Sequence, residues 1–284
     1  MKIENDFNLR AYNSYKLDCI CRRAYFPENE NDLIQIFSNT NTEKIILGNG
    51  NNTILSKEYY HQDFVIFNGC LNEIIFNGTE IISEGGATLL QMSELALEHS
   101  LKGLEMFYDI PSSVGGAVVM NAGSNGEEIG ALIKKVRYLD LADLQIKEKS
   151  KKELNFTYRN SCFQKNKDKI VLKVWFELEK GEKQNIKAKM EENRNRRWSK
   201  QPRDYPNCGS VFKRPEGRFV GPMLDELGLK GYTVGGAQIS TKHSGFIVNI
   251  GSAKGKDILR LITEVQIKVR ERFDVELEVE QRII

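Results

Sequence analysis

Short apolar runs separated by glycine and asparagine characterise the first third of the chain. Between residues 63 and 85 the runs DFVIFNG, NEIIFNG and TEIISEG alternate apolar with polar residues, and this pattern predicts short antiparallel strands. Residues 19–26 and 44–47 are also expected to be extended. The spacing of apolar residues in 31–39 and 88–100 instead predicts amphipathic helices. The N-terminal part is therefore expected to mix helices and strands.

The second half of the chain continues this mixture. The pattern predicts strands at 135–141, 145–149, 169–178 and 275–284, and helices at 183–200, 222–227 and 253–272. In the last strand the apolar residues from Val275 to Val279 alternate with three glutamates that end at Glu280. One face of this strand is expected to be buried and the other to present three carboxylates. We predict an α+β protein.

A boundary is expected near residue 200. The helix at 183–200 is rich in Glu, Lys and Arg, and Pro202 and Pro206 follow it. Prolines after a charged helix indicate its end, because proline cannot continue a helix. We therefore predict three parts: residues 1–57 as a first subdomain, to which the C-terminal strand can return, 58–200 as a second subdomain, and 201–284 as a separate ligand-binding domain.

Charge and composition exclude several kinds of protein. The 284 residues include 41 Lys and Arg against 39 Asp and Glu, and the net charge of +2 gives no basis for nucleic acid or an anionic membrane as the main partner. No apolar run approaches the roughly 20 residues of a membrane span, and the start MKIENDFNLR lacks the apolar core of a secretory signal. The five cysteines include no CxxC pair, so neither a disulfide framework nor a metal site is expected. These features predict a cytoplasmic protein.

Two segments are rich in glycine and small residues. ILGNGNNTIL occupies residues 46–55, and IPSSVGGAVVMNAGSNG occupies residues 110–126. Gly115, Gly116 and Gly123 can adopt positive φ and let main-chain N–H groups approach a ligand. A single segment of this kind is more often a tight turn between strands. Two of them in one chain predict a large nucleotide cofactor held by the backbone.

A few polar residues are candidates for chemistry. Arg159 lies among aromatic residues, and a partly buried guanidinium needs an anionic partner, which is either a ligand or a structural carboxylate. Ser210 follows a glycine and is either a turn residue or a displayed hydroxyl. No G-x-S-x-G segment occurs, so a serine hydrolase triad is not indicated. Glu280 either faces solvent or has a chemical role. His243, next to Lys242, either binds phosphate or lies in a surface turn.

Seven motifs occur in an order that one enzyme family shares. They are LGNGNNTIL, GLE followed by IPSSVGGAVVMNAG, FTYRNS, QPRDYPNCGSVFKRP, GGAQIS, KHSGFIVN and ELEVEQR. In this order, and over nearly the whole chain, they resemble the UDP-N-acetylenolpyruvylglucosamine reductase family in its compact type. The resemblance implies an FAD-containing enzyme of bacterial peptidoglycan synthesis. It also implies a two-subdomain FAD-binding fold of the PCMH or vanillyl-alcohol-oxidase type, followed by an α+β substrate-binding domain at 201–284.

The resemblance also assigns site residues. The residues implied to bind FAD are Gly48, Asn49, Gly50, Asn51, Asn52, Thr53, Pro111, Ser112, Ser113, Val114, Gly115, Gly116, Ala117, Asn121, Ala122 and Gly123. The first segment is expected to hold the pyrophosphate through main-chain donors and the second to lie along the isoalloxazine ring. The residues implied to be catalytic are Arg159, Ser210 and Glu280. Candidates for substrate binding, by location, are Tyr158, Lys213, Arg214, Gln238, Lys242 and His243, and no metal is expected.

The implied reaction uses NADPH as hydride donor and a nucleotide sugar as substrate. Hydride reaches the methylene carbon of an enolpyruvyl ether by way of FAD, and negative charge then develops on the neighbouring carbon and its carboxylate. Arg159 and a protonated Glu280 are suited to stabilise this charge. Ser210 is suited to donate a proton to the α carbon. A monomer is expected.

The chain departs from the family pattern at both glycine segments. Asp109 and Ser112 stand where glycines are usual, and Asn49 and Asn51 replace small residues. Asp and Asn tolerate left-handed backbone better than other non-glycine residues, so the fold can persist. These changes either weaken FAD binding or add hydrogen bonds. The alternative functions are a non-catalytic nucleotide-sugar binder and another flavin oxidoreductase on the same fold.

Overall fold

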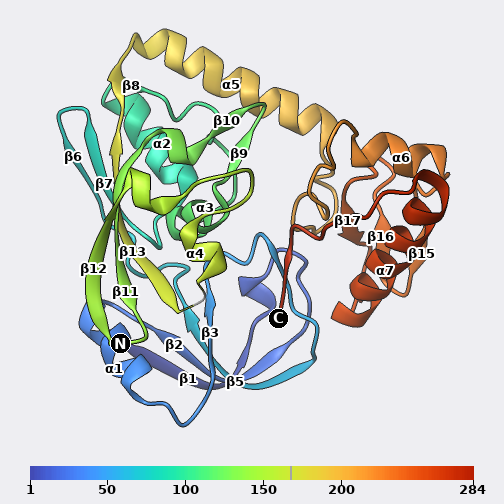
Figure 1. The fold of residues 1–284 in the computed structure, drawn as a ribbon, viewed down its shortest axis with the longest axis horizontal. Helices are drawn as coiled ribbons and strands as arrows, with labels where there is room; N and C mark the ends of the chain where they lie inside the picture. The colour runs from blue at the N-terminus through green and yellow to red at the C-terminus, as the bar shows by residue number, and fades with distance from the viewer. Residues whose placement is uncertain (167) are drawn as a thin grey trace. The chain divides into compact units, whose positions relative to one another are not determined.

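The structure, a computed structural model, describes residues 1–166 and 168–284 (Figure 1). Its helices are η1 (Arg10–Tyr12), α1 (Glu30–Ser38), α2 (Leu89–Glu98), α3 (Val114–Met120), η2 (Ile129–Ala131), η3 (Lys151–Leu154), α4 (Cys162–Lys165), α5 (Lys183–Lys200), α6 (Val220–Glu226) and α7 (Gly255–Phe273). Its strands are β1 (Lys2–Asn8), β2 (Ile20–Phe26), β3 (Lys44–Leu47), β4 (Thr53–Ile54), β5 (Tyr59–Ile66), β6 (Ile74–Asn77), β7 (Glu80–Glu84), β8 (Leu101–Lys102), β9 (Gly123–Ser124), β10 (Glu127–Glu128), β11 (Ile133–Asp140), β12 (Gln145–Ser150), β13 (Lys169–Glu177), β14 (Glu179–Lys180), β15 (Thr233–Val234), β16 (Ala237–Ile239), β17 (Ile247–Asn249) and β18 (Arg282–Ile283). The predicted α+β class is confirmed.

The chain forms two compact units. Unit 1 comprises residues 1–4, 23–49 and 62–195, and unit 2 comprises residues 5–22, 50–61 and 196–284. Strands β1, β2 and β5 each continue from one unit into the other. The predicted ligand-binding domain at 201–284 lies wholly in unit 2, together with two segments of the predicted first subdomain. The predicted division into 1–57, 58–200 and 201–284 stays a prediction.

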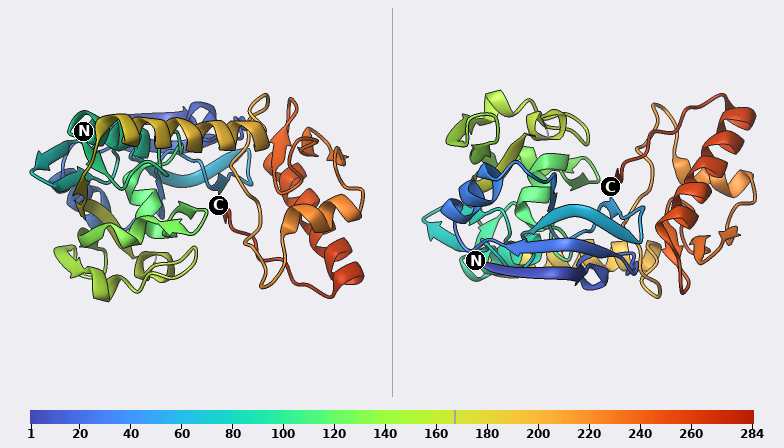
Figure 2. Two further views of the ribbon diagram at one scale, coloured as in Figure 1. Left: turned by 90° about the horizontal axis from the view of Figure 1, so that it is seen from above. Right: turned by 90° about the horizontal axis from the view of Figure 1, so that it is seen from below.

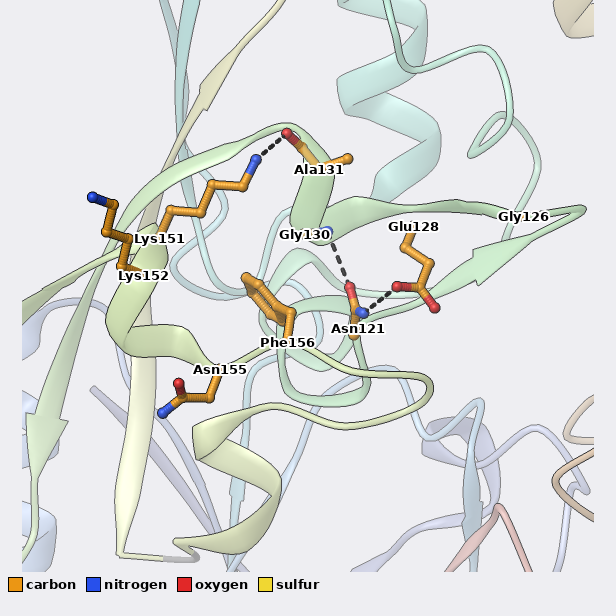
Figure 3. A pocket seen from close by; sticks show the side chains of 9 residues that line it. All are labelled: Asn121, Gly126, Glu128, Gly130, Ala131, Lys151, Lys152, Asn155 and Phe156. Atoms are coloured by element: carbon orange, nitrogen blue, oxygen red, sulfur yellow. Dashed lines mark hydrogen bonds between the residues drawn. The ribbon is translucent and has the colours of Figure 1, made fainter.

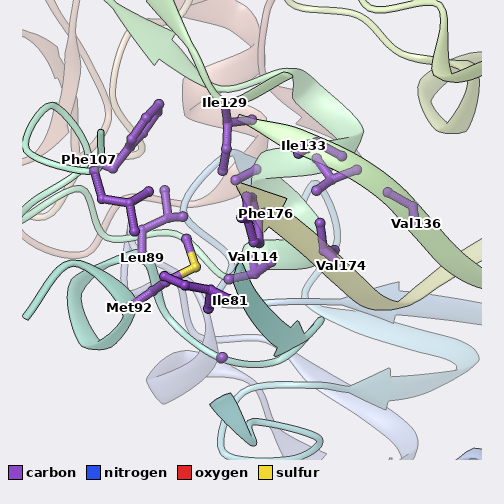
Figure 4. Packing of buried hydrophobic residues seen from close by; sticks show 14 of the residues in the cluster. Ile81, Leu89, Met92, Phe107, Val114, Ile129, Ile133, Val136, Val174 and Phe176 are labelled. Carbon is purple, nitrogen blue, oxygen red and sulfur yellow. The ribbon is translucent and has the colours of Figure 1, made fainter. Parts of the chain in front are cut away.

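Unit 1 is built on a five-stranded antiparallel sheet with the strand order β12-β11-β13-β7-β6. Helix α3 packs on β13 and β7. Figure 4 shows part of the resulting core, in which Leu89 and Met92 of α2 and Val114 of α3 lie with Val174 and Phe176 of β13. These side chains are fully buried. The second glycine-rich segment is therefore held by an extensive apolar cluster of unit 1, because α3 is part of that segment.

A second cluster in unit 1 joins α1 to the sheet. Leu33 and Ile36 of α1 are buried with Leu139 of β11 and Ile170 and Leu172 of β13. The guanidinium of Arg137 on β11 donates two hydrogen bonds of 2.9 Å each to the Glu30 carboxylate at the start of α1. Two parallel charge-assisted bonds of this kind are geometrically specific. The predicted helix at 31–39 is confirmed, and it begins after Asn29, whose side chain accepts a hydrogen bond from the Asp32 N–H.

The apolar run at 63–67 differs from its prediction. It lies mainly in β5, which pairs in parallel with β3 in a four-stranded sheet of order β1-β2-β5-β3 (Figure 2). Phe64, Val65 and Ile66 are all fully buried. A strand that is buried on both faces has no polar alternation and suits a parallel pairing. The prediction that this run joins the following antiparallel strands is wrong, whereas β6 and β7 form the predicted antiparallel pair.

Unit 2 contains a three-stranded sheet of order β15-β16-β17 covered by α7. Helix α7 is amphipathic, and its buried residues include Ile258, Leu261 and Val265 at helical spacing. Its first residue, Gly255, lies against the backbone of the 50–61 segment: a Cβ at this position would lie 2.1 Å from the Leu55 carbonyl oxygen. Glycine is thus needed here for close approach and not for its φ angle.

The C-terminal segment is extended but forms little regular strand. Only Arg282–Ile283 of the predicted strand at 275–284 forms a strand, β18, which pairs in parallel with β4. The C-terminal end therefore returns to the N-terminal part of the chain. Glu276 and Glu278 are exposed, whereas Glu280 is half-buried. The prediction of three solvent-facing glutamates therefore holds for Glu276 and Glu278 but only in part for Glu280, whose backbone N–H donates to the Val211 carbonyl.

Helices α5 and α7 are the longest in the described ranges, with 18 and 19 residues. Both carry many Lys, Arg and Glu residues. Within residues 1–166 and 168–284, no helix combines the length and apolar character that a membrane crossing requires.

Candidate functional site

The second glycine-rich segment forms a helix where a loop was expected. Helix α3 starts after Ser113, whose hydroxyl oxygen accepts a hydrogen bond from the Gly116 N–H at 3.2 Å. Gly115, Gly116 and Gly123 do not have positive φ, so this part of the prediction is wrong. Glycine is needed for close packing instead. A Cβ at Gly115 would lie 3.0 Å from the Gly85 carbonyl oxygen, and one at Gly123 would lie 2.2 Å from the Glu127 carbonyl oxygen.

Left-handed backbone occurs beside this helix at residues other than glycine. Asp109 has φ of +61° and Asn121 has φ of +45°. Asp and Asn are the residues that adopt this conformation at least cost after glycine. Ser112 does not have positive φ, and its backbone is paired: its N–H donates to Ile110 and its carbonyl accepts from Leu89. Asp109 therefore occupies a position that favours glycine, and Ser112 does not.

Asn121 connects the end of α3 to two loops. Its side chain is buried, and its amide nitrogen donates to the Glu128 carboxylate at 2.7 Å and to the Thr157 carbonyl at 3.0 Å. Its amide oxygen accepts from the Gly130 N–H at 3.0 Å. The sequence motif indicated this residue as a cofactor ligand, but its side chain has a structural role.

Arg159 lies in a tight turn that Asn121 helps to hold. Thr157 and Asn160 exchange two backbone hydrogen bonds, so Tyr158 and Arg159 occupy the centre of the turn. Arg159 has φ of +53°, which is uncommon for a residue with a long side chain and marks local strain. Its guanidinium donates to the Gly123 carbonyl at 2.8 Å. The structure thus brings the predicted residue Arg159 to the predicted cofactor-binding residue Gly123.

The first glycine-rich segment crosses the border between the units, and each half has its own contacts. In unit 1, a Cβ at Gly48 would lie 2.6 Å from the Ser113 hydroxyl oxygen. In unit 2, Gly50 has φ of +64°, and a Cβ there would lie 2.2 Å from the Tyr12 carbonyl oxygen. Asn49 Oδ1 and Asn51 Oδ1 are buried, and neither oxygen has a hydrogen-bond partner in the structure. A buried unpaired acceptor is costly unless a ligand pairs with it.

Ser210 and Glu280 lie on paired segments of unit 2, although 69 residues lie between them in the sequence. Phe212 and Val279 form an antiparallel bridge, and the Glu280 N–H donates to the Val211 carbonyl at 2.8 Å. Ser210 is exposed and Glu280 is half-buried. The Glu280 carbonyl also accepts from the Asn52 side chain at 3.1 Å. The structure therefore brings the predicted residues Ser210, Glu280 and Asn52 together.

The residues predicted to bind substrate in unit 2 have partners within that unit. Lys213 pairs with Glu278, and the Arg214 guanidinium lies 3.8 Å from the centre of the Phe219 ring. Gln238 donates to the Thr233 hydroxyl at 3.0 Å, and Lys242 donates to the Trp198 carbonyl at 2.8 Å.

His243 contributes little charge. Its Nδ1 accepts a hydrogen bond from the Gly245 N–H at 3.1 Å. Burial lowers the pKa of the imidazole, which favours the neutral form. A neutral imidazole brings no positive charge to a phosphate.

A cavity of about 490 Å³ opens beside Asn121 in unit 1 (Figure 3). The residues that line it are Asn121, Gly126, Glu128, Gly130, Ala131, Lys151, Lys152, Asn155 and Phe156. Lys151 donates to the Ala131 carbonyl at 2.6 Å, which closes one side. Asn121 alone among the predicted site residues lines this cavity. The Lys151–Lys152 pair is the one sequence feature that could have indicated this cavity, and an isolated pair of charges usually indicates a solvated surface.

Cys208 is expected to resist alkylation in the folded protein. The thiol is buried and donates to the Thr53 carbonyl at 3.4 Å, and burial raises its pKa to about 12. At pH 8 only about one thiol in 10⁴ is then ionised, and the thiolate is the reactive form. We expect iodoacetamide to label half-buried Cys70 well before Cys208, as measured by mass spectrometry of peptides. In denaturant all five cysteines should react alike, and early labelling of native Cys208 would contradict its burial.

Comparisons with known proteins cover the whole chain. A model of the C-terminal domain of UDP-N-acetylenolpyruvoylglucosamine reductase matches residues 201–284, and a model of an FAD binding domain matches residues 22–145. The chain is 43% identical to UDP-N-acetylenolpyruvoylglucosamine reductase of Francisella tularensis over 279 residues, which covers 98% of each chain. It is 42% identical to the protein of the same name from Caldanaerobacter subterraneus, with 97% of this chain and 91% of that protein covered. The crystal structure of UDP-N-acetylenolpyruvylglucosamine reductase from Thermus caldophilus has a TM-score of 0.84 and 30% identity, with 100% of this chain and 99% of that chain covered.

Proposed function

The chain belongs to the UDP-N-acetylenolpyruvoylglucosamine reductase family, and from this we propose that Arg159, Ser210 and Glu280 are the catalytic residues with which it reduces that nucleotide sugar. It is a flavin-dependent oxidoreductase of peptidoglycan synthesis that uses FAD and NADPH. The observation that carries the residue assignment is the pairing of the segment after Ser210 with the segment that ends at Glu280. This pairing brings the backbones of residues 210 and 280 close to each other although the two residues are distant in sequence.

The first glycine-rich segment fits FAD. Asn49 and Asn51 each have a buried amide oxygen without a partner. These oxygens are acceptors, so they suit the ribityl and ribose hydroxyl groups of FAD better than its pyrophosphate, which brings no donor. The proposed cofactor residues therefore include side chains as well as the main-chain donors of this segment. When bound, FAD supplies hydride transfer from NADPH to the enolpyruvyl double bond.

Arg159 is proposed to bind the substrate carboxylate. Hydride addition to the methylene carbon places negative charge on the neighbouring carbon and its carboxylate, and a guanidinium is always cationic and presents planar donors. The hydrogen bond from Arg159 to the Gly123 carbonyl and the strained turn hold this group in place. Preorganisation of this kind is what allows a cation to stabilise charge at the moment it develops.

Ser210 is proposed to donate the proton that completes the reduction. The α carbon receives the hydroxyl proton of Ser210 as the enolate collapses, and the serine regains a proton from solvent, so that one hydride and one proton are added across the double bond. Glu280, in its protonated form, is proposed to donate a hydrogen bond to the same carboxylate as Arg159. The exposure of Ser210 and the partial burial of Glu280 support these different roles.

Contacts with the rest of the nucleotide sugar are proposed for Tyr158, Lys213, Arg214, Gln238 and Lys242. The Tyr158 side chain is 49% exposed at the centre of the Arg159 turn, which is an accessible position for a sugar or base. The small-molecule substrate follows from the family, whereas the monomeric state and the cytoplasmic location are proposals. Five unbridged cysteines support the cytoplasmic location.

An anaerobic titration tests this function. The purified protein, loaded with FAD, should lose its yellow colour with NADPH and regain it when UDP-N-acetylenolpyruvoylglucosamine is added, with a product two hydrogen atoms heavier by mass spectrometry. Protein that cannot be loaded with FAD would indicate a nucleotide-sugar binder. Bleaching by NADPH without recovery by the nucleotide sugar would indicate a different flavin oxidoreductase.

A further inference from the structure

The side chain of Gln281 makes several hydrogen bonds to the backbone of residues 208–210, the loop that leads to Ser210. The side chain is 4% exposed. Its amide nitrogen faces three successive carbonyl oxygens, those of Cys208 at 3.1 Å, Gly209 at 3.3 Å and Ser210 at 3.3 Å. An amide nitrogen has two hydrogens, so three acceptors on one side use its full donor capacity. The amide therefore fixes the path of the backbone that leads to Ser210.

The other end of the same amide is also held. Gln281 Oε1 accepts a hydrogen bond from the Tyr15 hydroxyl at 3.0 Å. Tyr15 is fully buried, and its own carbonyl accepts from the Asn249 side chain at 2.8 Å. Because Tyr15 can only donate to Oε1, this contact determines which end of the Gln281 amide points to the carbonyls. The chain of contacts from Asn249 through Tyr15 to Gln281 lies wholly within unit 2.

Ser210 itself forms an antiparallel bridge with Phe246, but the glycine turn that precedes it is less restrained. Gly209 has φ of +77°, and a Cβ at this position would meet no atom within 4 Å. A glycine with open surroundings has many alternative conformations. The residue before Gln281 is Glu280, whose backbone is paired with Val211. One side chain thus ties the glycine turn before Ser210 to the segment that carries Glu280.

From these contacts we infer that Gln281 is a positioning residue for Ser210, acting through the carbonyls of 208–210 and oriented by Tyr15. This inference rests on the proposed function, because it assumes that Ser210 is the proton donor. A donor that is misaligned by about 1 Å loses roughly 10²-fold in rate. Loss of the Gln281 amide should therefore slow proton transfer without affecting hydride transfer from NADPH.

The test compares the two half-reactions in stopped-flow experiments on FAD-loaded enzyme. Gln281→Met keeps the length of the side chain and removes its hydrogen bonds. We expect flavin reoxidation by the enolpyruvyl nucleotide sugar to slow about 10- to 100-fold, and flavin reduction by NADPH to stay within about twofold of wild type. Tyr15→Phe, the matched control, leaves the Gln281 donors in place and should slow reoxidation less than Gln281→Met. If Gln281→Met does not fold, Gln281→Leu takes its place, since its side chain also lacks the donors.

A double-mutant cycle separates positioning from a structural role. In the Ser210→Ala background, Gln281→Met should change reoxidation less than about twofold, because the group that it positions is gone. An equal effect of Gln281→Met with and without Ser210, or equal slowing of both half-reactions, would overturn the inference. Failure of the proposed function gives a different result, in which Ser210→Ala alone leaves reoxidation unchanged. The thermal melting temperature of each variant shows whether the folded state persists.

Discussion

Replacing Ser210 by alanine slows flavin reoxidation by the enolpyruvyl nucleotide sugar about 10²- to 10⁴-fold, which is the range that a positioned acid contributes. Reduction of the flavin by NADPH needs no proton from this side chain and is expected to stay near the wild-type rate. Stopped-flow absorbance of the flavin measures the two steps separately. The side chain is exposed on a segment fixed by pairing with Phe246 and with the C-terminal segment, so its removal should leave the fold unchanged.

Two variants serve as controls for this result. Ser210→Cys keeps a proton donor at the same position and should retain more reoxidation activity than Ser210→Ala. Ser199→Ala removes an exposed hydroxyl that donates to the Arg196 carbonyl at the end of α5, and it should leave both steps unchanged. Equal slowing of reduction and reoxidation in Ser210→Ala would contradict the role of proton donor, because it would indicate a general effect on the site.

Replacing Phe176 by alanine lowers the free energy of unfolding by about 3–5 kcal/mol, the cost of truncating a fully buried aromatic side chain. Phe176 is 0% exposed and lies in the central strand β13, paired with Ile81 of β7 and Ile133 of β11. In Figure 4 it lies within the same cluster as Val114 of α3. A cavity here loosens the support of α3, so FAD retention should also decrease. Urea denaturation followed by circular dichroism measures the change.

The control for Phe176 lies in the same sheet. Ile75 of the edge strand β6 is 43% exposed, and Ile75→Ala should cost less than about 1 kcal/mol. Phe176→Leu, which leaves a smaller cavity, should fall between the two. A cost below about 1 kcal/mol for Phe176→Ala would mean that this cluster collapses around the gap and does not support α3 rigidly.

Local pattern predicted the longer helices and most strands of this protein well, but not α3 and α4. The helix at 183–200 and the strands at 44–47, 135–141, 145–149 and 169–178 agree with the structure because they depend on spacing within a short segment. The run at 63–67 was assigned to the wrong partners, since the apolar pattern of a strand does not say which strand lies beside it. Most of the segment at 275–284 was wrongly predicted to be a strand. Its apolar and polar residues alternate because the segment is extended, but few of its residues pair with another strand.

The composition of the second glycine-rich segment did not show why its glycines are required. Glycines at 115, 116 and 123 were expected to supply unusual φ angles, but positive φ occurs instead at Asn121, Asn125 and Gly126 of this segment and at Asp109 just before it. The glycines are required because other backbone segments, such as those at Gly85 and Glu127, pass too close for a Cβ. Which carbonyl lies against which glycine depends on the packing of remote segments and has no local signal.

The order of motifs along the chain was sufficient for the family, for FAD and NADPH, and for the choice of Arg159, Ser210 and Glu280 as candidates, because these depend on residue identity and spacing alone. The tertiary structure decided the contacts between distant segments. It paired the loop at Ser210 with Glu280, buried Gln281 between Tyr15 and three carbonyls, and anchored Arg159 on Gly123. The physical reason is that a hydrogen bond between residues remote in sequence requires the backbone path between them, and that path is set by the packing of the whole unit.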